Sequence, residues 1–532
     1  MTFEEFKNGI EALDEKQLSA MIERRHPFYK LLKPHWDFLE ATYDGGREWF
    51  DANLFKFHKE GIEEFKDRRE RAYRPNHTRE VVDLVNKYIF KATIARKLED
   101  APDHVKAFWN NATMHRRDVT DFMRLVSQKS SIFGKVWVVM DSIAPVDGAS
   151  IADEKEGKAR VYGYIVKPQN ALDMAFDATG ALQWIMLMES HRDDELFGGS
   201  GEVKPRYRLW TQNYWALFEE VKHRGSRKKY ALIEAGEHDL GVTPVFAVDH
   251  VVSEDLYWAT GLIDDVAYLD RAVANYLSNI DAIIQDQTFS QLVVPAQAIM
   301  PDDDGEKKII EMGSKRIFTY DAQAGVAPSF IAPDPRQAGL ILSVINKLIS
   351  EIYHTVGMSG ERTKEDNATG IDNSSGVAKA YDFERMNAML ASKAQSLQTA
   401  ERMMVGLVRL YHSDGDPAKV FEDEDSALVS YPGNFDVRSL YDEFEIASQL
   451  ALLSAPDKVR QEQMKLLIDK LFPGLSEKLI AELKKSAEVE WPVQPPEPAP
   501  AGGSTPPRPS SQSKQGQNNK DAKEPKTAKP RD

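Results

Sequence analysis

The chain has 532 residues, of which 42% are hydrophobic and 10% aromatic, enough to bury the cores of several globular domains. It contains no cysteine, which excludes disulfide bonds and thiolate metal sites, and no run approaches the ~18 apolar residues of a membrane span, so neither a span nor a secretion signal is predicted. The formal net charge of −16 argues against general electrostatic binding of a phosphate backbone, because such binding depends on basic side chains that displace counterions.

About the first 130 residues are predicted to be helical, with a loop at 43–50. A basic cluster follows that loop and is interleaved with acids. Such interleaving favours a solvated, salt-paired helix face, and contact with phosphates is the alternative. The basic residues are Arg68, Arg69, Arg71 and Arg74, and the acids are Glu60, Glu63, Glu64, Asp67 and Glu70.

From Ile132 the pattern changes to short β-branched or aromatic runs bounded by Gly, Pro, Asp and Asn. Runs of this kind predict strands, and Gln212-Asn213 between two of them predicts a hairpin. We therefore expect a mainly antiparallel β-region inserted into a helical protein. The runs are 136–140, 161–166, 184–188, 207–211, 214–218 and 244–248.

Two apolar-striped helices are predicted next, over 260–287 and 334–356, on either side of a short β-rich insert at 288–333. In the first helix, apolar residues recur every three or four positions from Leu262 to Ile284, which is the spacing of one helix face. The insert carries strand-like runs at 292–294 and 316–320.

The starts of both helices carry recognisable signals. Thr260 is expected to cap the first, and Asp264 and Asp265 follow in its first turns, where the helix dipole favours anions. The second begins at Asp334, an acid cap, with Pro335 at the first helical position.

A third and longer helix is predicted over 374–412, because apolar side chains recur from Val377 to Tyr411 without a proline. The loop before it, Gly357 to Asn373, has 17 residues, which is longer than compact domains normally place between two ordered helices. It is either a moving part or a plain linker.

Beyond Ser413 an irregular stretch runs to Phe435, and three amphipathic helices are predicted near 440–454, 456–471 and 476–485, with Pro456 at a first helical position. The segment from Trp491 onward holds ten of the 27 prolines and is predicted to be disordered. Its seven basic residues and four acids give it a charge of +3, so the rest of the chain carries −19.

The search for chemistry in the sequence is negative. Phe133-Gly134-Lys135-Val136 lacks the upstream glycine and the Ser/Thr of a phosphate-binding loop. Residues 300–311 mimic a calcium loop, but Met300 cannot supply its first ligand. The 12 histidines include no pair at helical spacing. We therefore expect no catalytic residue, no metal ion and no cofactor, and we do not expect an enzyme.

The order of these parts, together with five short motifs, resembles the portal proteins of tailed bacteriophages over about residues 30–485. In those proteins the parts are called wing, stem, clip, stem, tunnel loop, backbone helix and crown. The motifs are Tyr43-Asp44-Gly45-Gly46, Asn76-His77-Thr78-Arg79-Glu80-Val81-Val82-Asp83, Phe133-Gly134-Lys135-Val136-Trp137-Val138, Gly241-Val242-Thr243-Pro244-Val245 and Ser375-Gly376-Val377-Ala378-Lys379-Ala380-Tyr381-Asp382-Phe383-Glu384.

The resemblance implies a portal-like α+β fold that is mainly α. It assigns a wing to 1–259 (helical over 1–130 and β-rich over 131–250), stem helices to 260–287 and 334–356, a clip to 288–333, a tunnel loop to 357–373, a backbone helix and return to the wing to 374–435, a crown to 436–490 and a disordered tail to 491–532.

The resemblance also implies a homo-oligomeric ring, usually a dodecamer, at one capsid vertex of the virion, assembled in the host cytoplasm. A separate terminase would package double-stranded DNA through the ring without sequence-specific binding, and the DNA would later be ejected through it. Expected partners are the major capsid or scaffolding protein, the terminase large subunit and a head-completion or tail adaptor protein. The alternatives are a non-catalytic helical scaffold or adaptor and an enzyme of unrecognised type.

Two sets of residues are candidates for the channel. The aspartates Asp264, Asp265, Asp270, Asp281 and Asp286 either line it or form an ordinary exposed helix face, and an acidic wall lets a polyanion slide. By resemblance, the narrowest point is the loop, whose charges nearly cancel. Its residues include Gly357, Met358, Ser359, Gly360, Glu361, Arg362, Lys364, Glu365, Asp366 and Gly370.

Overall fold

The computed structural model describes residues 2–143, 160–221, 229–288, 291–295, 318–320, 329–331, 335–358, 376–414, 417, 428–435, 450, 456–471 and 477–489, except positions 59, 193, 195 and 196. The chain divides into two compact units, Met1–Asp436 and Val437–Asp532. The elements combine helices and sheets, with helices in the majority, as the α+β prediction requires.

The N-terminal part of the first unit is helical, as predicted. Thr2 and Asp14 begin the first two helices with reciprocal capping boxes, and Asn76 and Asp118 cap later ones through their side-chain oxygens. The helices are α1 (Phe3–Glu11), α2 (Glu15–Glu23), α3 (Tyr29–Asp44), α4 (Arg47–Asn53), α5 (Ile62–Arg71), α6 (His77–Lys91), α7 (Asp103–Asn110) and α8 (Val119–Phe133).

The predicted β-region forms two antiparallel sheets, one of three strands in the order β3-β2-β9 and one of five in the order β4-β5-β6-β7-β8. The hairpin prediction is confirmed, since β6 and β7 pair on either side of residues 212 and 213. The strands are β2 (Lys135–Ser142), β3 (Val161–Val166), β4 (Ala171–Phe176), β5 (Leu182–Arg192), β6 (Val203–Thr211), β7 (Tyr214–Val221), β8 (Lys229–Glu237) and β9 (Val245–Asp249).

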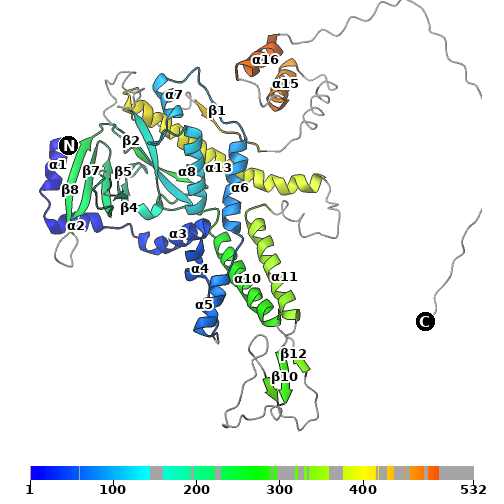
Figure 1. Cartoon of the computed structure of the whole chain (residues 1–532). Helices are drawn as coiled ribbons and strands as arrows, with labels where there is room; N and C mark the ends of the chain where they lie inside the picture. The colour runs from blue at the N-terminus through cyan, green and yellow to red at the C-terminus, as the bar shows by residue number, and fades with distance from the viewer. Residues whose placement is uncertain are drawn as a thin grey trace, which may run out of the picture. The chain divides into compact units, whose positions relative to one another are not determined.

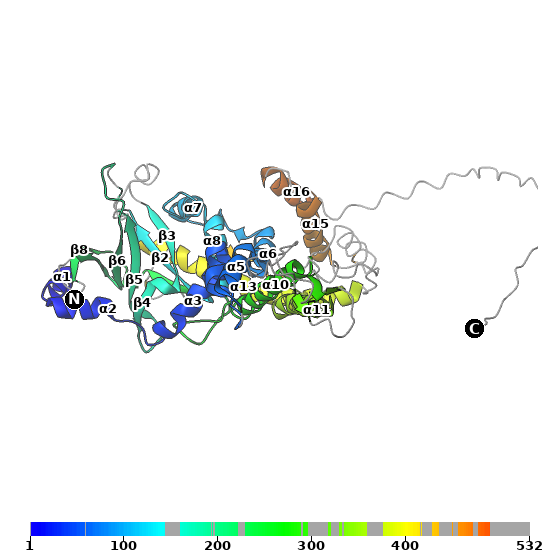
Figure 2. The ribbon, with the colours of Figure 1, turned by 60° about the horizontal axis from the view of Figure 1, so that its bottom comes forward.

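Helices pack against both sheets. Residues 135–140 of β2 are all buried, because α8 and α13 (Gly376–Tyr411) pack against this strand. This double cover explains why the segment reads as a continuous apolar run rather than an alternating one. On the larger sheet, α1 and α2 contact β8 (Figure 2).

Two long helices, α10 (Val266–Thr288) and α11 (Pro335–Thr355), contact each other along their length and are called the helix pair below (Figure 1). The second begins at Pro335 as predicted. The prediction that the first begins at Thr260 is wrong by six residues. Leu262 N donates to Ser131 O at 2.9 Å, so this segment is held against the end of α8 instead of opening a helix.

The insert between these two helices contains a small sheet. Strand β10 (Gln291–Pro295) pairs in parallel with β11 (Phe318–Tyr320) and antiparallel with β12 (Ser329–Ile331). Both predicted strand runs are confirmed within these limits, and β12 is an addition. The remaining residues of 288–333 lie outside the described part of the chain.

The long helix α13 has 36 residues, so the helix predicted over 374–412 is confirmed to within two residues. Leu390, Leu397, Met404 and Val408 are buried along it. It contacts α7, α8, β2, β3 and β9 as well as β13 (Val429–Ser430), which pairs with β1 (Ala95–Arg96). The α13 helix therefore ties the N-terminal helices to the three-stranded sheet.

The second unit contains α15 (Asp457–Leu471) and α16 (Glu477–Val489), which pack against each other. These match two of the three predicted C-terminal helices. Pro456 precedes α15, and its carbonyl accepts from Val459 N and Arg460 N, so it lies at the cap rather than the first helical position. The helix predicted near 440–454, apart from residue 450, and the predicted disordered tail fall outside the described residues.

Gly134 makes the turn from α8 into β2. Its φ is +79°, its N–H donates to Ser130 O at 2.9 Å, and its carbonyl accepts from His250 N at 2.6 Å. A Cβ at this position would overlap the carbonyl oxygen of Ala259. Both the backbone conformation and the close approach therefore require glycine.

Gly134→Ala is expected to lower the free energy of unfolding by about 3 to 5 kcal/mol, because left-handed strain adds to the steric overlap. The matched control is Gly180→Ala, where φ is +86° but no atom lies within 4 Å of the added Cβ. The control should lose only about 1 to 2 kcal/mol. Urea denaturation of both variants measures this difference, and equal losses would contradict the overlap.

Candidate functional site

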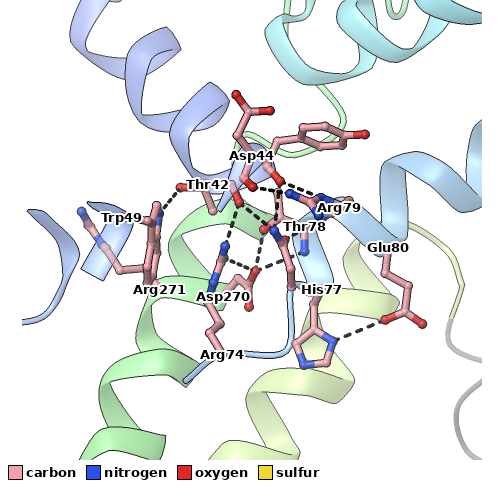
Figure 3. Close-up of polar contacts among 12 residues, drawn as sticks. Thr42, Asp44, Trp49, Arg74, His77, Thr78, Arg79, Glu80, Asp270 and Arg271 are labelled. Carbon is pink, nitrogen blue, oxygen red and sulfur yellow. Dashed lines mark hydrogen bonds and ion pairs between the residues drawn. The ribbon is translucent and has the colours of Figure 1, made fainter. Parts of the chain in front are cut away.

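The start of α6 is tied to the end of α3 by side chains that bond backbone carbonyls (Figure 3). Asn76 donates its Nδ2 to Thr42 O at 3.2 Å and Tyr43 O at 3.0 Å, and its Oδ1 caps α6 by accepting from Arg79 N at 2.9 Å. The Arg79 guanidinium donates to Tyr43 O at 3.0 Å and to Asp44 O. The carbonyls that end α3 are therefore satisfied by the cap of α6.

Asp270 connects α10 to this junction and is fully buried. Its Oδ2 accepts from Arg74 Nη1 at 2.6 Å, from Thr78 Oγ1 at 2.8 Å and from Thr78 N at 3.2 Å. Three donors on one oxygen stabilise the ionised carboxylate. Its other oxygen, Oδ1, has no hydrogen-bond partner among the described residues.

Arg74 is also buried, and its guanidinium lies 4.0 Å from the centre of the Trp49 ring. A second nitrogen, Nη2, donates to Thr42 O at 2.8 Å. Burial lowers the pKa of Arg74, and the charge of Asp270 opposes that shift. The two groups thus form a buried ion pair with supporting hydrogen bonds. Water cannot reach either group to replace its charged partner.

The other member of the helix pair reaches the same turn of α6 through Tyr353. The Tyr353 hydroxyl donates to Glu80 Oε2 at 2.5 Å and lies 3.2 Å from His77 Nδ1. The Tyr353 and His77 rings meet edge to face, with centroids 5.9 Å apart. Both α10 and α11 are therefore anchored to the first turn of α6, and we call residues 74–80 with Asp270 and Tyr353 the junction.

The predicted acidic face does not form as one surface. Asp270 is buried in an ion pair, so the prediction that it is exposed, whether as channel lining or as an ordinary helix face, is wrong. Asp264 lies before the helix, 3.4 Å from His35, and Asp281 pairs with Arg71 at 3.3 Å. Asp265 is exposed, and the side chain of Asp286 lies outside the described residues.

The predicted basic cluster is salt-paired, as expected, but half of it is not solvated. Arg68 is buried and bonds the Glu60 carboxylate at 2.6 and 2.8 Å, Ser278 Oγ at 2.9 Å and Phe55 O at 2.8 Å. Arg69 pairs with Asp51 at 3.1 Å. A solvated face is therefore wrong for Arg68 and Arg74, whose side chains join α5 and the segment after it to α10.

The predicted tunnel loop is described only at its start. Gly357, at φ +74°, ends α11, with its N–H donating to His354 O at 3.1 Å and Met358 N donating to Tyr353 O at 2.7 Å. This is the paired hydrogen-bond pattern of a glycine-terminated helix. Met358 is buried. Ser359, Gly360, Glu361, Arg362, Lys364, Glu365, Asp366 and Gly370 lie outside the described residues.

A second buried polar cluster, which the sequence interpretation missed, lies where α13 crosses α8 and β9. Lys393 is fully buried and its ammonium group bonds Ser130 Oγ. Lys135 Nζ lies 2.7 Å from Asp249, and His250 Nδ1 lies 3.4 Å from Ser131 Oγ. The sequence did contain a signal for a buried lysine, because Lys393 falls between Leu390 and Leu397 on the apolar stripe of α13.

Burial is the main cause that lowers the pKa of Lys393 to about 7, and Asp249 opposes the shift. Burial also lowers the pKa of His250 well below its usual value, with the charge of Lys393 acting in the same direction. In this cluster the Lys135–Asp249 pair is already neutral in sum, so a proton on Lys393 adds an uncompensated charge to the interior.

Neither cluster has the composition of a metal site: among the described residues, no group of three or more His, Asp or Glu side chains could hold a metal ion. Within the same residues, no helix has the length and apolar character needed to cross a bilayer.

No family model matches the chain, and no curated protein matches it. Among solved structures, it is similar to a chain in the neck of an empty GTA particle, at 10% identity and a TM-score of 0.36, over 74% of this chain and 90% of that chain. It is also similar to a chain in the virion of a native gene transfer agent (GTA) particle, at 9% identity and a TM-score of 0.32, over 71% and 85% of the two chains. At these values neither similarity establishes a shared fold or function.

The Arg74–Asp270 pair gives a double-mutant test. Asp270→Ala should lower the free energy of unfolding by about 3 to 5 kcal/mol, because it leaves a buried guanidinium without its carboxylate. Arg74→Met combined with Asp270→Leu should recover most of that loss, since no unpaired buried charge remains. Denaturant unfolding of the two single variants and the double variant measures the coupling. Additive losses would contradict a buried ion pair.

Lys393 predicts a pH dependence. Between about pH 7 and 10 the unfolded chain holds a proton on Lys393 that the folded chain releases, so the wild-type free energy of unfolding should rise with pH there, by on the order of 3 kcal/mol from pH 7 to 9.5. Below pH 7 both states are protonated and the contribution is constant. Lys393→Met should be more stable at pH 7 and should lack the rise. Parallel wild-type and variant curves over this range would contradict the assignment.

Proposed function

We propose that this chain is a portal-type subunit, copies of which form a ring around a DNA channel at one vertex of a phage-like particle. The element order carries the proposal: α10, a small three-stranded sheet, α11, a connection of 20 residues and then the 36-residue α13. This order corresponds to the stem, clip, stem, tunnel loop and backbone helix of the resemblance. The chain itself supplies no chemistry in this proposal, and a separate motor moves the DNA.

Apolar side chains on the helix pair support assembly. Five large hydrophobic residues remain well exposed in the single chain, although α10 and α11 already pack against each other. A second copy would cover them, and a repeated contact between two different surfaces closes into a ring when the rotation permits. These residues are Tyr268, Tyr276 and Ile284 on α10 and Leu340 and Leu342 on α11.

In this proposal, fewer of the predicted aspartates can line the channel. Among the predicted aspartates, Asp265 keeps an exposed side chain, Asp281 is partly neutralised by Arg71, and Asp270 belongs to the interior. A DNA-guiding wall would therefore use few fixed charges from α10, which agrees with passage without strong binding. The tunnel-loop residues stay candidates by resemblance.

The proposal predicts the mass of the assembled protein. The full chain should elute as a closed ring of about twelve times the 60.1 kDa subunit mass, with a central hole in electron micrographs. Leu340→Glu combined with Leu342→Glu should shift it to monomers that keep the wild-type circular dichroism, because carboxylates replace the apolar contact. Light scattering coupled to gel filtration measures both.

The matched control is Val203→Glu with Ile233→Glu, which adds the same charge at two exposed positions of the five-stranded sheet. This control should still form rings. A stable wild-type monomer, or a large assembly without a hole, would favour the scaffold or adaptor alternative and refute the portal proposal.

A further inference from the structure

A surface groove lies between α6 and α8, which pack against each other in the first unit. Its volume is about 410 Å³. Three cationic side chains, Lys87, Lys91 and Arg124, line it together with Phe90, Leu125 and a single acid, Asp83. The groove is therefore basic on the surface of a chain whose formal net charge is −16.

The two lysines are one helical turn apart and both are exposed. Neither makes an ion pair or a side-chain hydrogen bond with any described residue. Like charges at this spacing destabilise a helix by a few tenths of a kcal/mol, and no carboxylate among the described residues pairs with either lysine to offset this repulsion. Some other lysines of the first unit, in contrast, have carboxylate partners, as Lys33 has in Asp37 and Lys167 has in Glu40.

Arg124 is the third cation of the groove. Its guanidinium lies 5.3 Å from the centre of the Phe90 ring, and its Nη1 bonds Asp121 at 2.9 Å. Both Arg124 and Asp121 are about half exposed, so this pair is weak and leaves guanidinium N–H groups for another anion.

The acid in the lining, Asp83, forms no ion pair with either lysine among the described residues. Asp83 Oδ1 accepts from the Tyr43 hydroxyl at 2.9 Å, and Tyr43 in turn accepts from Gln128 Nε2 at 2.5 Å. Burial, followed by the bond to Asp83, raises the pKa of Tyr43, so the hydroxyl keeps its proton and remains a donor to the carboxylate.

We propose that this groove binds an acidic peptide segment of a partner protein, with carboxylates of the peptide pairing with Lys87, Lys91 and Arg124 and its apolar side chains resting on Phe90 and Leu125. Charge complementarity selects the occupant, because three cations face a concave surface without enough carboxylates of their own. Duplex DNA fits less well, since its affinity grows with the number of phosphates neutralised and this groove offers three cations. The inference does not depend on the proposed function.

The test is fluorescence anisotropy of the full chain with a labelled hexaglutamate peptide at low salt. Binding should weaken as salt rises. Lys87→Glu combined with Lys91→Glu should weaken it at least tenfold, and Arg124→Gln should weaken it severalfold. The matched control, Lys16→Glu with Lys30→Glu, makes the same change in net charge at exposed lysines of α2 and α3 and should bind like the wild type.

Each other outcome overturns the proposal. Absence of binding by the wild type, or equal weakening by the control pair, would mean that the groove is not a peptide site. A labelled 12-base-pair duplex that binds more tightly than the peptide and is lost in the Lys87/Lys91 variant would make it a phosphate-backbone site instead. Circular dichroism of each variant separates loss of binding from loss of fold.

Discussion

The buried pair of Arg74 and Asp270 is the constraint on which the arrangement of the helix pair depends. Asp270 receives three hydrogen bonds on one oxygen, all from residues 74 and 78, and both charged groups are shielded from water. Moving α10 away from α6 would separate these charges in the interior, at a cost of several kcal/mol. Thr42 and Trp49 fix Arg74 from the other side, so α3, α4, α6 and α10 share one polar centre.

A second buried polar group, Lys393, lies at the packing of α13. Lys393 stabilises the packing of α13 only while it is neutral, because the cluster around it already contains a balanced pair in Lys135 and Asp249. Lys393 thus favours the folded state in its uncharged form. Of the two long helices, α10 is held by a buried ion pair, whereas α13 is held by a cluster that disfavours a proton on Lys393.

The sequence predicted elements well where periodicity or a cap signalled them, as for the start of α11 at Pro335 and the length of α13. The sequence-based predictions were wrong where residues far apart in the chain determine the structure. The start of α10 depends on Ser131, and the burial of Asp270 depends on Arg74, which lies 196 residues earlier. Strands β4 and β8 were missed because Ala171–Phe176 and Lys229–Glu237 contain acids and small residues that lower strand propensity, and their neighbours in the sheet supply the missing stabilisation.

Helix α6 contributes residues to both the junction and the basic groove. Its first turn holds α10 and α11 through Thr78, His77 and Glu80, and its last turns carry Lys87 and Lys91 at the rim of the groove. Between them, Val81, Val82, Val85 and Ile89 are completely buried, so the helix cannot rotate without exposing its core face. A partner bound in the groove would therefore occupy a fixed position relative to the helix pair. A substitution at Lys87 or Lys91 should also leave the junction intact. Both side chains face solvent, and α6 is packed through its opposite face, so the substitution removes no buried contact.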